Sequence, residues 1–345
     1  MASNRYDRVR GMLVNRSAKR YRFEQWTSAV FSRGITDPSD VTTLPSDLRH
    51  AIAAELDGSF PSLQLDRTDV DGQATKYRFR LEDRLAIETV NLRYKRGWTS
   101  LCISSQAGCA LGCTFCATAT LGLKRQLTAD EITDQVLWTQ LHVRRPESIA
   151  FMGMGEPLAN PAVVDAIDVL TDPQLFGFSP RRITVSTVGI THRLADLLDH
   201  NPKINMTFSL HAADPSIRRQ LVPFEDRYPT AEILPILDDY IIRTRRQVTL
   251  ACTLIDGLND TEAAGQDLIR LLAARGRTRR NYHVNLYALN TSPLVSAAWR
   301  PSPPARVRAF ADQLRRHGIS VSWRAQFGKD VQAGCGQLAA SASTS

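Results

Sequence analysis

Four of the six cysteines of this chain lie in one short segment, residues 102–116, which reads CISSQAGCALGCTFC. Three of them, Cys109, Cys113 and Cys116, have the spacing C-x3-C-x2-C. A cubane 4Fe-4S cluster usually takes four thiolates, so a loop that offers three would leave one iron open for a substrate. Zinc sites usually combine paired C-x2-C or H-x3-5-H elements, and no second pair follows here. We therefore predict an iron–sulfur cluster, with a zinc site and buried structural cysteines as the alternatives.

The composition is that of a water-soluble globular protein. The chain has 345 residues, of which 43% are hydrophobic, and this length is enough for one large core plus a small extra domain. No run approaches the ~20 apolar residues that span a bilayer. The first residues carry charges where a signal peptide needs an apolar core. We expect a cytoplasmic protein with no membrane partner, in which clustered cysteines bind metal or react rather than form disulfides.

The net charge of +8 suits a polyanionic partner such as a nucleic acid. The alternative is that the many arginines reflect composition and form ordinary solvated faces. Charge alone leaves both interpretations open. The clustered basic residues are Arg5, Arg8, Arg10, Arg16, Lys19, Arg20, Arg22, Arg275, Arg277, Arg279 and Arg280.

Residues 1–90 differ in pattern from the rest of the chain and are predicted to form an N-terminal accessory domain. They contain two helical segments, Phe23–Ser32 and Pro45–Leu56, and a hairpin from about Leu63 to Val90. An Asp-Gly pair at positions 71–72 supplies the turn signal of that hairpin.

From residue 95 onward, apolar β-rich runs alternate with helical patterns. One helix, Thr128–Val143, begins with a capping box formed by Thr128 and Glu131. Such alternation implies an α/β fold with a parallel sheet and right-handed crossovers. Six units are fewer than the eight of a closed barrel, so we predict a partial (β/α)6 barrel over 95–330 and a C-terminal segment over 331–345. The candidate strands are Thr99–Ser104, Ser148–Met152, Arg182–Ser186, Asn205–Leu210, Gln247–Thr253 and His283–Leu289; further helices are Asp260–Ala274 and Pro304–His317, the latter followed by Ile319–Trp323.

Unusual residues follow the carboxyl ends of these strands, where parallel α/β folds carry their active sites. Gly153 and Gly155 would let a ligand approach the backbone, and Glu156 can accept a hydrogen bond from an ammonium group. A single glycine, serine or asparagine at a strand end is more often a turn or a cap, but several at one edge favour a site. The others are Ser186, Ser209, Leu210, His211 and Asn290.

These segments resemble the Cfr/RlmN family of radical S-adenosylmethionine (SAM) enzymes, which methylate adenosine in ribosomal RNA. The cysteine triad alone indicates only the superfamily, whereas its combination with Cys102 and the terminal AGCGQL is more specific. The resemblance extends from about residue 86 to 338, and the N-terminal part is similar only in length and general character. The resembling blocks are IETVNLRYKRGW, CISSQAGCALGCTFCATA, FMGMGEPLAN, SPRRITVSTVGI, TFSLHAADPSIRRQLVPFEDRYP, NYHVNLYALN and AGCGQL.

The resemblance implies one 4Fe-4S cluster, held by the three cysteines of the triad, with SAM at the open iron. One-electron cleavage of SAM would give a 5′-deoxyadenosyl radical. Two SAM molecules would be used per turnover, and an electron donor such as flavodoxin or ferredoxin would be a partner. Gly155 and Glu156 match residues that bind the amino end of SAM. The rest of the SAM site is matched by Ser186, Ser209, Leu210, His211 and Asn290.

The resemblance also gives roles to residues that the cluster does not need. Cys335 would receive a methyl group from one SAM, and a radical from the second would activate that methyl group to add to the adenine ring. Cys102 would resolve the adduct through a transient disulfide with Cys335, and Glu88 matches the proposed proton acceptor. From the residues alone, Cys102 can instead be a core residue, and Glu88 can be a solvated strand residue. We place the remaining cysteine, Cys252, in the core.

Members of the family methylate C8 or C2 of one adenosine near the peptidyl-transferase centre of 23S rRNA, and some C2 enzymes also modify tRNA. RYKRGW, ADEITDQ, SPRRITVSTVGI and RAQFGKDV resemble the C8, antibiotic-resistance type, whereas Pro157 is usual for the C2 type. We predict C8, with C2 methylation, possible on tRNA as well, as the alternative. Two other classes stay open: a radical SAM enzyme acting on a peptide or small molecule, and a non-catalytic iron–sulfur or zinc RNA-binding protein.

An adenine must be unstacked to be methylated, and the surrounding RNA must be held by basic side chains. We expect two arginine pairs near the active-site edge to do so, Arg181-Arg182 and Arg218-Arg219. Trp98 and Tyr228 could stack on bases, although each can equally be a packing residue.

Overall fold

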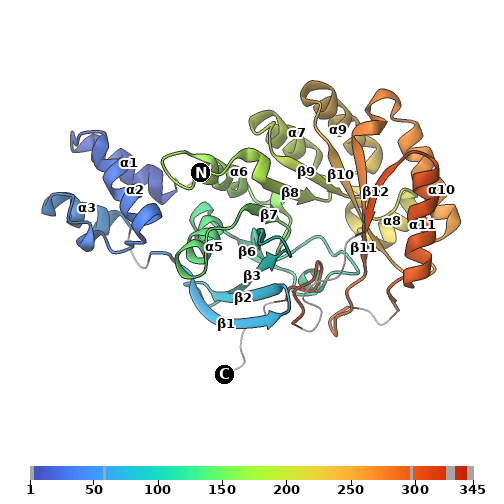
Figure 1. Ribbon diagram of the computed structural model, residues 1–345, viewed down its shortest axis with the longest axis horizontal. Coiled ribbons are helices and arrows are strands. Elements are labelled where there is room, and N and C mark those ends of the chain that lie inside the picture. Colours follow the sequence, from blue (N-terminus) through green and yellow to red (C-terminus); the bar gives the residue numbers. More distant parts are fainter. Residues whose placement is uncertain (1–3, 57–59, 296–297, 324–330, 340–345) are drawn as a thin grey trace.

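The computed structural model describes residues 4–56, 60–295, 298–323 and 331–339. Predictions that fall on residues 324–330, which make up most of RAQFGKDV, and on residues 340–345 lie outside the described residues. One curved sheet of ten strands organises the fold, with the linear order β1-β2-β3-β4-β7-β8-β9-β10-β11-β12 (Figure 1). β1 and β12 are the two edge strands of the sheet and do not pair with each other. The barrel is therefore partial, as predicted.

In the part of the sheet ordered β4-β7-β8-β9-β10-β11-β12, each strand is parallel to the next. Their positions agree with the predicted strands to within one or two residues, and the last predicted unit contributes β12 as an edge strand. The α/β fold with a parallel sheet is therefore confirmed. The parallel strands are β4 (Thr99–Ile103), β7 (Ser148–Phe151), β8 (Ile183–Thr187), β9 (Asn205–Ser209), β10 (Val248–Leu254), β11 (Tyr282–Ala288) and β12 (Ser320–Trp323).

Helices follow the parallel strands and cover the outer, convex side of the sheet, where Figure 1 shows α7, α9, α10 and α11. The predicted capping box at Thr128 and Glu131 is confirmed, with each side chain accepting from the other residue's backbone N–H. No helix among the described residues is both long and apolar enough to cross a bilayer. The helices of this part are α4 (Ala117–Thr120), α5 (Ala129–His142), α6 (Ala162–Thr171), α7 (Thr191–His200), α8 (Pro215–Leu221), α9 (Thr230–Thr244), α10 (Glu262–Ala273) and α11 (Pro304–Arg316), with short 3-10 turns at η2 (Pro157–Ala159), η3 (Pro180–Arg182), η4 (Pro223–Asp226) and η5 (Gly276–Asn281).

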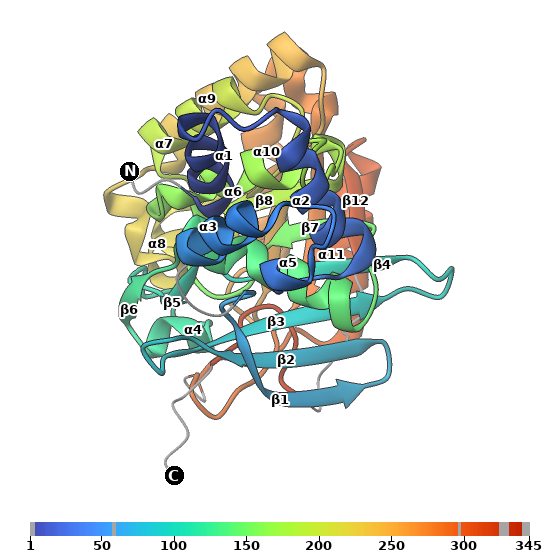
Figure 2. The ribbon, with the colours of Figure 1, turned by 90° about the vertical axis from the view of Figure 1, so that its left-hand side faces the viewer.

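The N-terminal strands continue the same sheet, because β3 pairs antiparallel with β4. The predicted hairpin is present, with Gly72 at its turn, and β3 adds a third strand (Figure 2). Whether residues 1–90 fold as a separate domain stays a prediction, as do the boundaries at 95–330 and 331–345. The elements are α1 (Arg5–Asn15), α2 (Tyr21–Arg33), η1 (Pro38–Asp40), α3 (Ser46–Leu56), β1 (Gln64–Asp71), β2 (Ala74–Arg80) and β3 (Ala86–Arg93), and a separate two-stranded sheet is formed by β5 (Gln106–Gly108) and β6 (Leu123–Gln126).

The helix α1 was not among the predicted helices, and its arginines serve the fold. The Arg5 guanidinium donates to both carboxylate oxygens of Asp134 on α5, at 3.1 and 2.9 Å, and both side chains are buried. Asp134 also accepts from the backbone N–H of Ser62 at 2.7 Å. Arg8 and Arg10 form ion pairs with acidic residues of α3 and of the loop after α6. Part of the basic cluster expected to face a polyanion therefore joins the N-terminal helices to the core.

We predict that Asp134→Ala lowers the free energy of unfolding by about 3 kcal/mol, because it leaves the Arg5 guanidinium buried without its partner. Urea unfolding followed by circular dichroism measures the loss. The control is Asp239→Ala, which removes an exposed partner of Arg243 and is expected to cost less than about 1 kcal/mol. Equal losses in the two variants would contradict the role given to the Arg5–Asp134 pair.

Candidate active site

The cysteine loop runs from β5 to β6, and because these two strands pair with each other in a small separate sheet, both ends of the loop are fixed. The backbone N–H of Cys109 donates to the Gly122 carbonyl at 3.1 Å, and that of Cys116 donates to the Cys113 carbonyl at 3.1 Å. Cys116 then begins α4 as its N-cap residue. The loop is therefore closed on itself, with its three thiols held on one side by local hydrogen bonds.

All three cysteines of the loop line one cavity of about 160 Å³ at the carboxyl ends of the parallel strands. We call this space the reaction cavity. Six other residues singled out in the sequence line it as well, although they come from three strand ends and from the C-terminal segment: Gly155, Glu156, Ser186, Ser209, His211 and Cys335. The predicted residues Leu210, Asn290, Cys102 and Glu88 lie around the cavity rather than in its lining.

The donor set of the loop fits a cubane cluster. Among the described residues, no three His, Cys, Asp or Glu side chains converge as ligands of a single ion. The thiolates of a cubane bind different irons and need not meet at one point, whereas zinc ligands must. Burial raises the pKa of the Cys109 thiol to about 12, and a bound metal ion would oppose this by stabilising the thiolate. Cys109, Cys113 and Cys116 are thus the residues that would hold the cluster.

Glu156 is buried and fully occupied by the protein. Its carboxylate accepts from the Thr187 hydroxyl, from the Val188 N–H at 3.1 Å and from the Leu158 N–H at 3.0 Å. Burial raises the pKa of Glu156 to about 7, and these donors oppose the shift. The carboxylate therefore ties the end of β8 to the loop after β7. The preceding Gly155 has φ +97°, and a Cβ there would lie 2.5 Å from Gln106 Cβ.

Two hydroxyls and an imidazole line the wall of the reaction cavity. Ser186 and Ser209 lie on adjacent strands with their Oγ atoms 3.3 Å apart. The His211 ring packs against the Phe115 ring at a tilt of 52°, with the ring centroids 4.6 Å apart, and His211 Nδ1 accepts from the Thr253 N–H at 3.2 Å. Burial lowers the pKa of His211 to about 3, so the ring is neutral and carries its proton on Nε2. These residues offer donors and acceptors to a polar ligand.

Leu210 and Asn290 contribute to the site through other residues. The Leu210 carbonyl accepts from Arg218 Nε at 3.0 Å, while its side chain is buried in the core. Asn290 Nδ2 donates to the Cys335 carbonyl at 3.0 Å, and Asn290 Oδ1 is buried with no hydrogen-bond partner among the described residues. A buried acceptor without a donor is costly, so this oxygen is suited to a hydroxyl or N–H of a bound ligand.

The C-terminal segment 331–339 packs over the cysteine loop (Figure 1). The Gly336 carbonyl accepts from the Ala117 N–H at 2.7 Å, and the Leu338 carbonyl accepts from the Thr118 hydroxyl at 2.5 Å. A Cβ on Gly334 would lie 2.5 Å from Asn290 Nδ2, so a larger residue would displace the Asn290 side chain. The segment places the exposed side chain of Cys335 at the reaction cavity.

Cys102 approaches Cys335 from the sheet, although the two are far apart in sequence. Cys102 lies on β4, paired with Ala150 of β7, and its thiol interacts with the backbone of Met152. Burial raises the pKa of Cys102 strongly, and the nearby Cys335 thiol raises it further. The two cysteines are therefore close enough to interact electrostatically. Cys252, in contrast, lies in the hydrophobic core with 3% of its surface exposed, as predicted.

Glu88 is buried on β3, so the alternative of a solvated strand residue is wrong. One carboxylate oxygen accepts from the Ala339 N–H at 2.9 Å, and the other pairs with the Lys76 ammonium at 3.1 Å. Lys76 balances the buried negative charge. Sequence analysis did not single out Lys76, because the alternation of β2 alone cannot show that it faces an acidic partner.

Of the two arginine pairs, only Arg218-Arg219 lies near the active-site edge, and of these two residues only Arg219, which pairs with Asp226, is exposed. Arg181 and Arg182 precede β8, so they stand at the opposite end of the parallel sheet from the cysteine loop. Arg218 is buried, forms an ion pair with Glu225 and donates to the carbonyls of Leu210, Val188 and Ser209. Arg218 therefore holds the strand ends together through these carbonyls. Because its side chain is buried, it cannot contact RNA.

Comparison with known proteins places this geometry in a family. The radical SAM superfamily matches residues 103–265. A protein of Lachnoclostridium phytofermentans named ribosomal RNA large subunit methyltransferase Cfr is 41% identical over 338 residues, which covers 98% of each chain. The protein of the same name from Staphylococcus aureus is 40% identical over 334 residues, covering 97% of this chain and 96% of that one.

The chain belongs to the Cfr family of radical SAM methyltransferases. A crystal structure of a radical SAM methyltransferase from Sphaerobacter thermophilus has the same fold over nearly the whole chain, with a TM-score of 0.88, 35% sequence identity, and coverage of 97% of this chain and 98% of that one. The predicted family and the partial radical SAM barrel are confirmed. Membership in the radical SAM class implies a 4Fe-4S cluster and SAM as cofactors, and the donor set described above fits them.

We predict that Cys113→Ala, like the same change at Cys109 or Cys116, lowers the iron content of the anaerobically reconstituted protein from about four atoms per chain to near zero. Cys252→Ala is the matched control, because it removes a buried thiol outside the reaction cavity. Iron analysis and the visible absorbance of the cluster measure the effect. Full iron in the Cys113 variant would show that the cluster is held elsewhere.

Proposed function

We propose that this Cfr-family protein methylates C8 of an adenosine in the peptidyl-transferase centre of 23S rRNA, by way of a methylated Cys335. The observation that supports the proposal best is the meeting of three groups: the cysteine loop, Cys335 and Cys102. A radical SAM enzyme that acts on a peptide or small molecule would have no use for the last two. The relatives named ribosomal RNA large subunit methyltransferase support the substrate class.

The bound cluster and SAM would supply the methyl group and, from a second SAM, the radical that activates it. The residues of this chain hold the methyl carbon and accept the proton. Cys335 keeps the methyl carbon at the reaction cavity until that carbon bonds to the adenine ring. Glu88, which contacts the same C-terminal segment, would accept the proton that the ring carbon loses, and the single electron left on the ring by the radical addition would return to the cluster.

Release of the product needs the second cysteine. The Cys102 sulfur attacks the Cys335 sulfur, so an S–S bond forms while the bond between Cys335 and the methylene carbon breaks. The electron pair of the broken bond goes to the methylene carbon, which takes up a proton and becomes the methyl group of the product. Two electrons from an external donor, such as flavodoxin or ferredoxin, return both cysteines to thiols. The electrostatic interaction between the Cys102 and Cys335 thiols supports this step.

The choice of C8 rests on the sequence blocks that resemble the C8, antibiotic-resistance type. C2 methylation of the same adenosine, and of tRNA, is the competing outcome, and Pro157 is the residue that favours it. Pro157 is the first residue of the short 3-10 turn η2, directly after Glu156, and it is far from Cys335 in the sequence. The cytoplasm, where ribosomes are assembled, is the compartment in which we expect the protein to act.

We predict that Cys335→Ala and Cys102→Ala fail in different ways. Cys335→Ala keeps the cluster but transfers no methyl group to RNA, because the acceptor is gone. Cys102→Ala forms the bond to adenine and cannot release it, so a covalent protein–RNA adduct accumulates on denaturing gels. Cys252→Ala, the control, turns over normally. Release of free methylated RNA by the Cys102 variant would contradict its role in resolution.

We predict that 23S rRNA from cells producing the protein contains 8-methyladenosine in the peptidyl-transferase centre, and that cells producing Cys335→Ala lack it. Mass spectrometry of rRNA fragments and of the released nucleosides measures the position. The presence of 2-methyladenosine would keep the mechanism and overturn the choice of carbon. An unmodified 23S rRNA would overturn the proposed substrate.

A further inference from the structure

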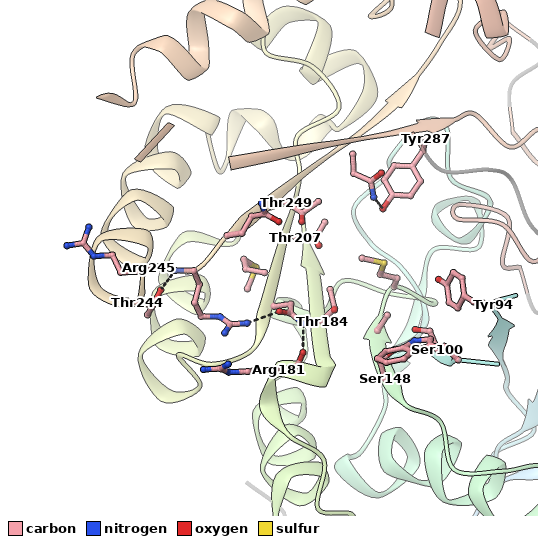
Figure 3. Close-up of a pocket in the computed structure, with 18 residues that line it drawn as sticks. Tyr94, Ser100, Ser148, Arg181, Thr184, Thr207, Thr244, Arg245, Thr249 and Tyr287 are labelled. Atoms are coloured by element: carbon pink, nitrogen blue, oxygen red, sulfur yellow. Dashed lines mark hydrogen bonds between the residues drawn. The ribbon is translucent and has the colours of Figure 1, made fainter. Parts of the chain in front are cut away.

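A second and larger cavity, of about 860 Å³, occupies the concave inside of the parallel sheet (Figure 3). We call it the lumen. Its volume is in the range of nucleotide and cofactor sites. Met152 and Tyr287 line both the lumen and the reaction cavity, so the two spaces adjoin. The lumen wall is defined by six polar residues: Ser100, Ser148, Thr184, Thr207, Thr249 and Asn285.

The wall of the lumen is unusual for a parallel barrel. Branched apolar side chains usually fill such barrels, and strands buried on both faces read as continuous apolar runs. Here β8, β9 and β10 alternate instead: apolar residues face the helices, while Thr184, Thr207 and Thr249 face the lumen, where Figure 3 shows all three. Thr207 and Thr249 are register partners on neighbouring strands. Unfilled hydroxyl walls of this kind are suited to a polar ligand.

Positive charge surrounds the entrance of the lumen at the amino ends of the strands. Arg181, Arg245 and Arg246 line it, and the described residues that line it include no Asp or Glu. Arg246 is held in place by Asn205 Oδ1 at 2.7 Å and by the Ile204 carbonyl at 3.2 Å. Arg246 is fixed in this way, and a lining that holds three arginines, with no Asp or Glu among its described residues, favours an anion such as a phosphate group.

An aromatic platform stands on the other side of the entrance. Tyr94 and Trp98, from the turn between β3 and β4, line the lumen, and the Arg182 guanidinium lies over the Trp98 ring at 4.2 Å. Arginine and aromatic planes are the surfaces on which unstacked bases pack. The lumen therefore combines the three contacts that a nucleotide needs: cations for phosphate, hydroxyls for ribose and base edges, and a plane for stacking.

We propose that the lumen is a nucleotide-binding site, which holds a ribonucleotide of the substrate RNA next to the adenosine that is methylated. This inference rests on the proposed function, because the RNA would reach the reaction cavity past Met152 and Tyr287. The phosphate lies at the three arginines, and the base lies toward Trp98. A free mononucleotide has the same chemistry and is the other source to be distinguished.

Substitutions that fill the lumen, or that remove polar and charged groups from its wall, test this proposal. Thr249→Leu fills the space, Thr249→Val removes only the hydroxyl with nearly the same shape, and Arg245→Ala removes an exposed cation. The control is Arg308→Ala, which removes an exposed arginine from α11 on the outer side of the sheet. Four quantities are measured: KM and kcat with a 23S rRNA fragment, affinity for that RNA by filter binding, affinity for AMP by calorimetry, and formation of 5′-deoxyadenosine without RNA.

The expected result is a rise in KM and in the RNA dissociation constant of at least threefold for Arg245→Ala and tenfold for Thr249→Leu. Thr249→Val is expected to give an intermediate rise. RNA-free 5′-deoxyadenosine formation, which reports the folded cluster site, should be unchanged in all variants. Arg308→Ala should behave as the wild type does.

The other outcomes separate the alternatives. AMP binding that is lost in Thr249→Leu, with RNA affinity unchanged, would assign the site to a free nucleotide and overturn the RNA assignment. Unchanged affinity for both RNA and AMP in Thr249→Leu and Arg245→Ala would overturn the site altogether. Because the binding measurements need no turnover, they decide the question even if the wild type methylates no rRNA, which is the failure of the proposed function itself.

Discussion

The packing of residues 331–339 against the cysteine loop is the contact on which the chemistry depends. Three backbone hydrogen bonds fix this segment, from Ala117, from the Thr118 side chain and to Glu88. Each uses a main-chain group of the segment, so the position of Cys335 is set by the backbone and not by its own side chain. The same contacts bring together β3, α4 and the C-terminal segment. In the proposed reaction Cys335 has to meet both the cluster and Cys102, and this packing holds Cys335 at the reaction cavity.

The sheet serves two purposes through its two faces. Its outer face is apolar and packs against the helices, with Val185, Phe208 and Leu250 among the fully buried residues. Its inner face is polar and stays open. This separation lets the barrel be stable while its interior holds ligands, because the helices and not the lumen supply most of the buried apolar area. The buried Arg218 and Glu156 then lock the strand ends around the reaction cavity.

Much of the fold could be predicted from patterns among residues that are close in the sequence. The capping box, the six strands and the hairpin turn are properties of neighbouring residues, and they could be read directly. The residues of the reaction cavity were found because parallel strands bring their carboxyl ends to one edge. In contrast, the partners of Arg5, Arg218 and Lys76 are distant in sequence, so charge alone could not separate buried ion pairs from RNA contacts. The polar lumen was not predicted, because the alternation in ITVST and NMTFS does not show that several strands curve around one shared space.

The most direct measurement of the central claim is the mass of the peptide that contains Cys335. The protein, with its cluster intact, is digested after incubation with SAM, and every cysteine-containing peptide is examined. The account predicts one added methyl group on Cys335 and none on the other five cysteines. An enzyme that methylates RNA while Cys335 stays unmodified throughout the reaction would contradict it.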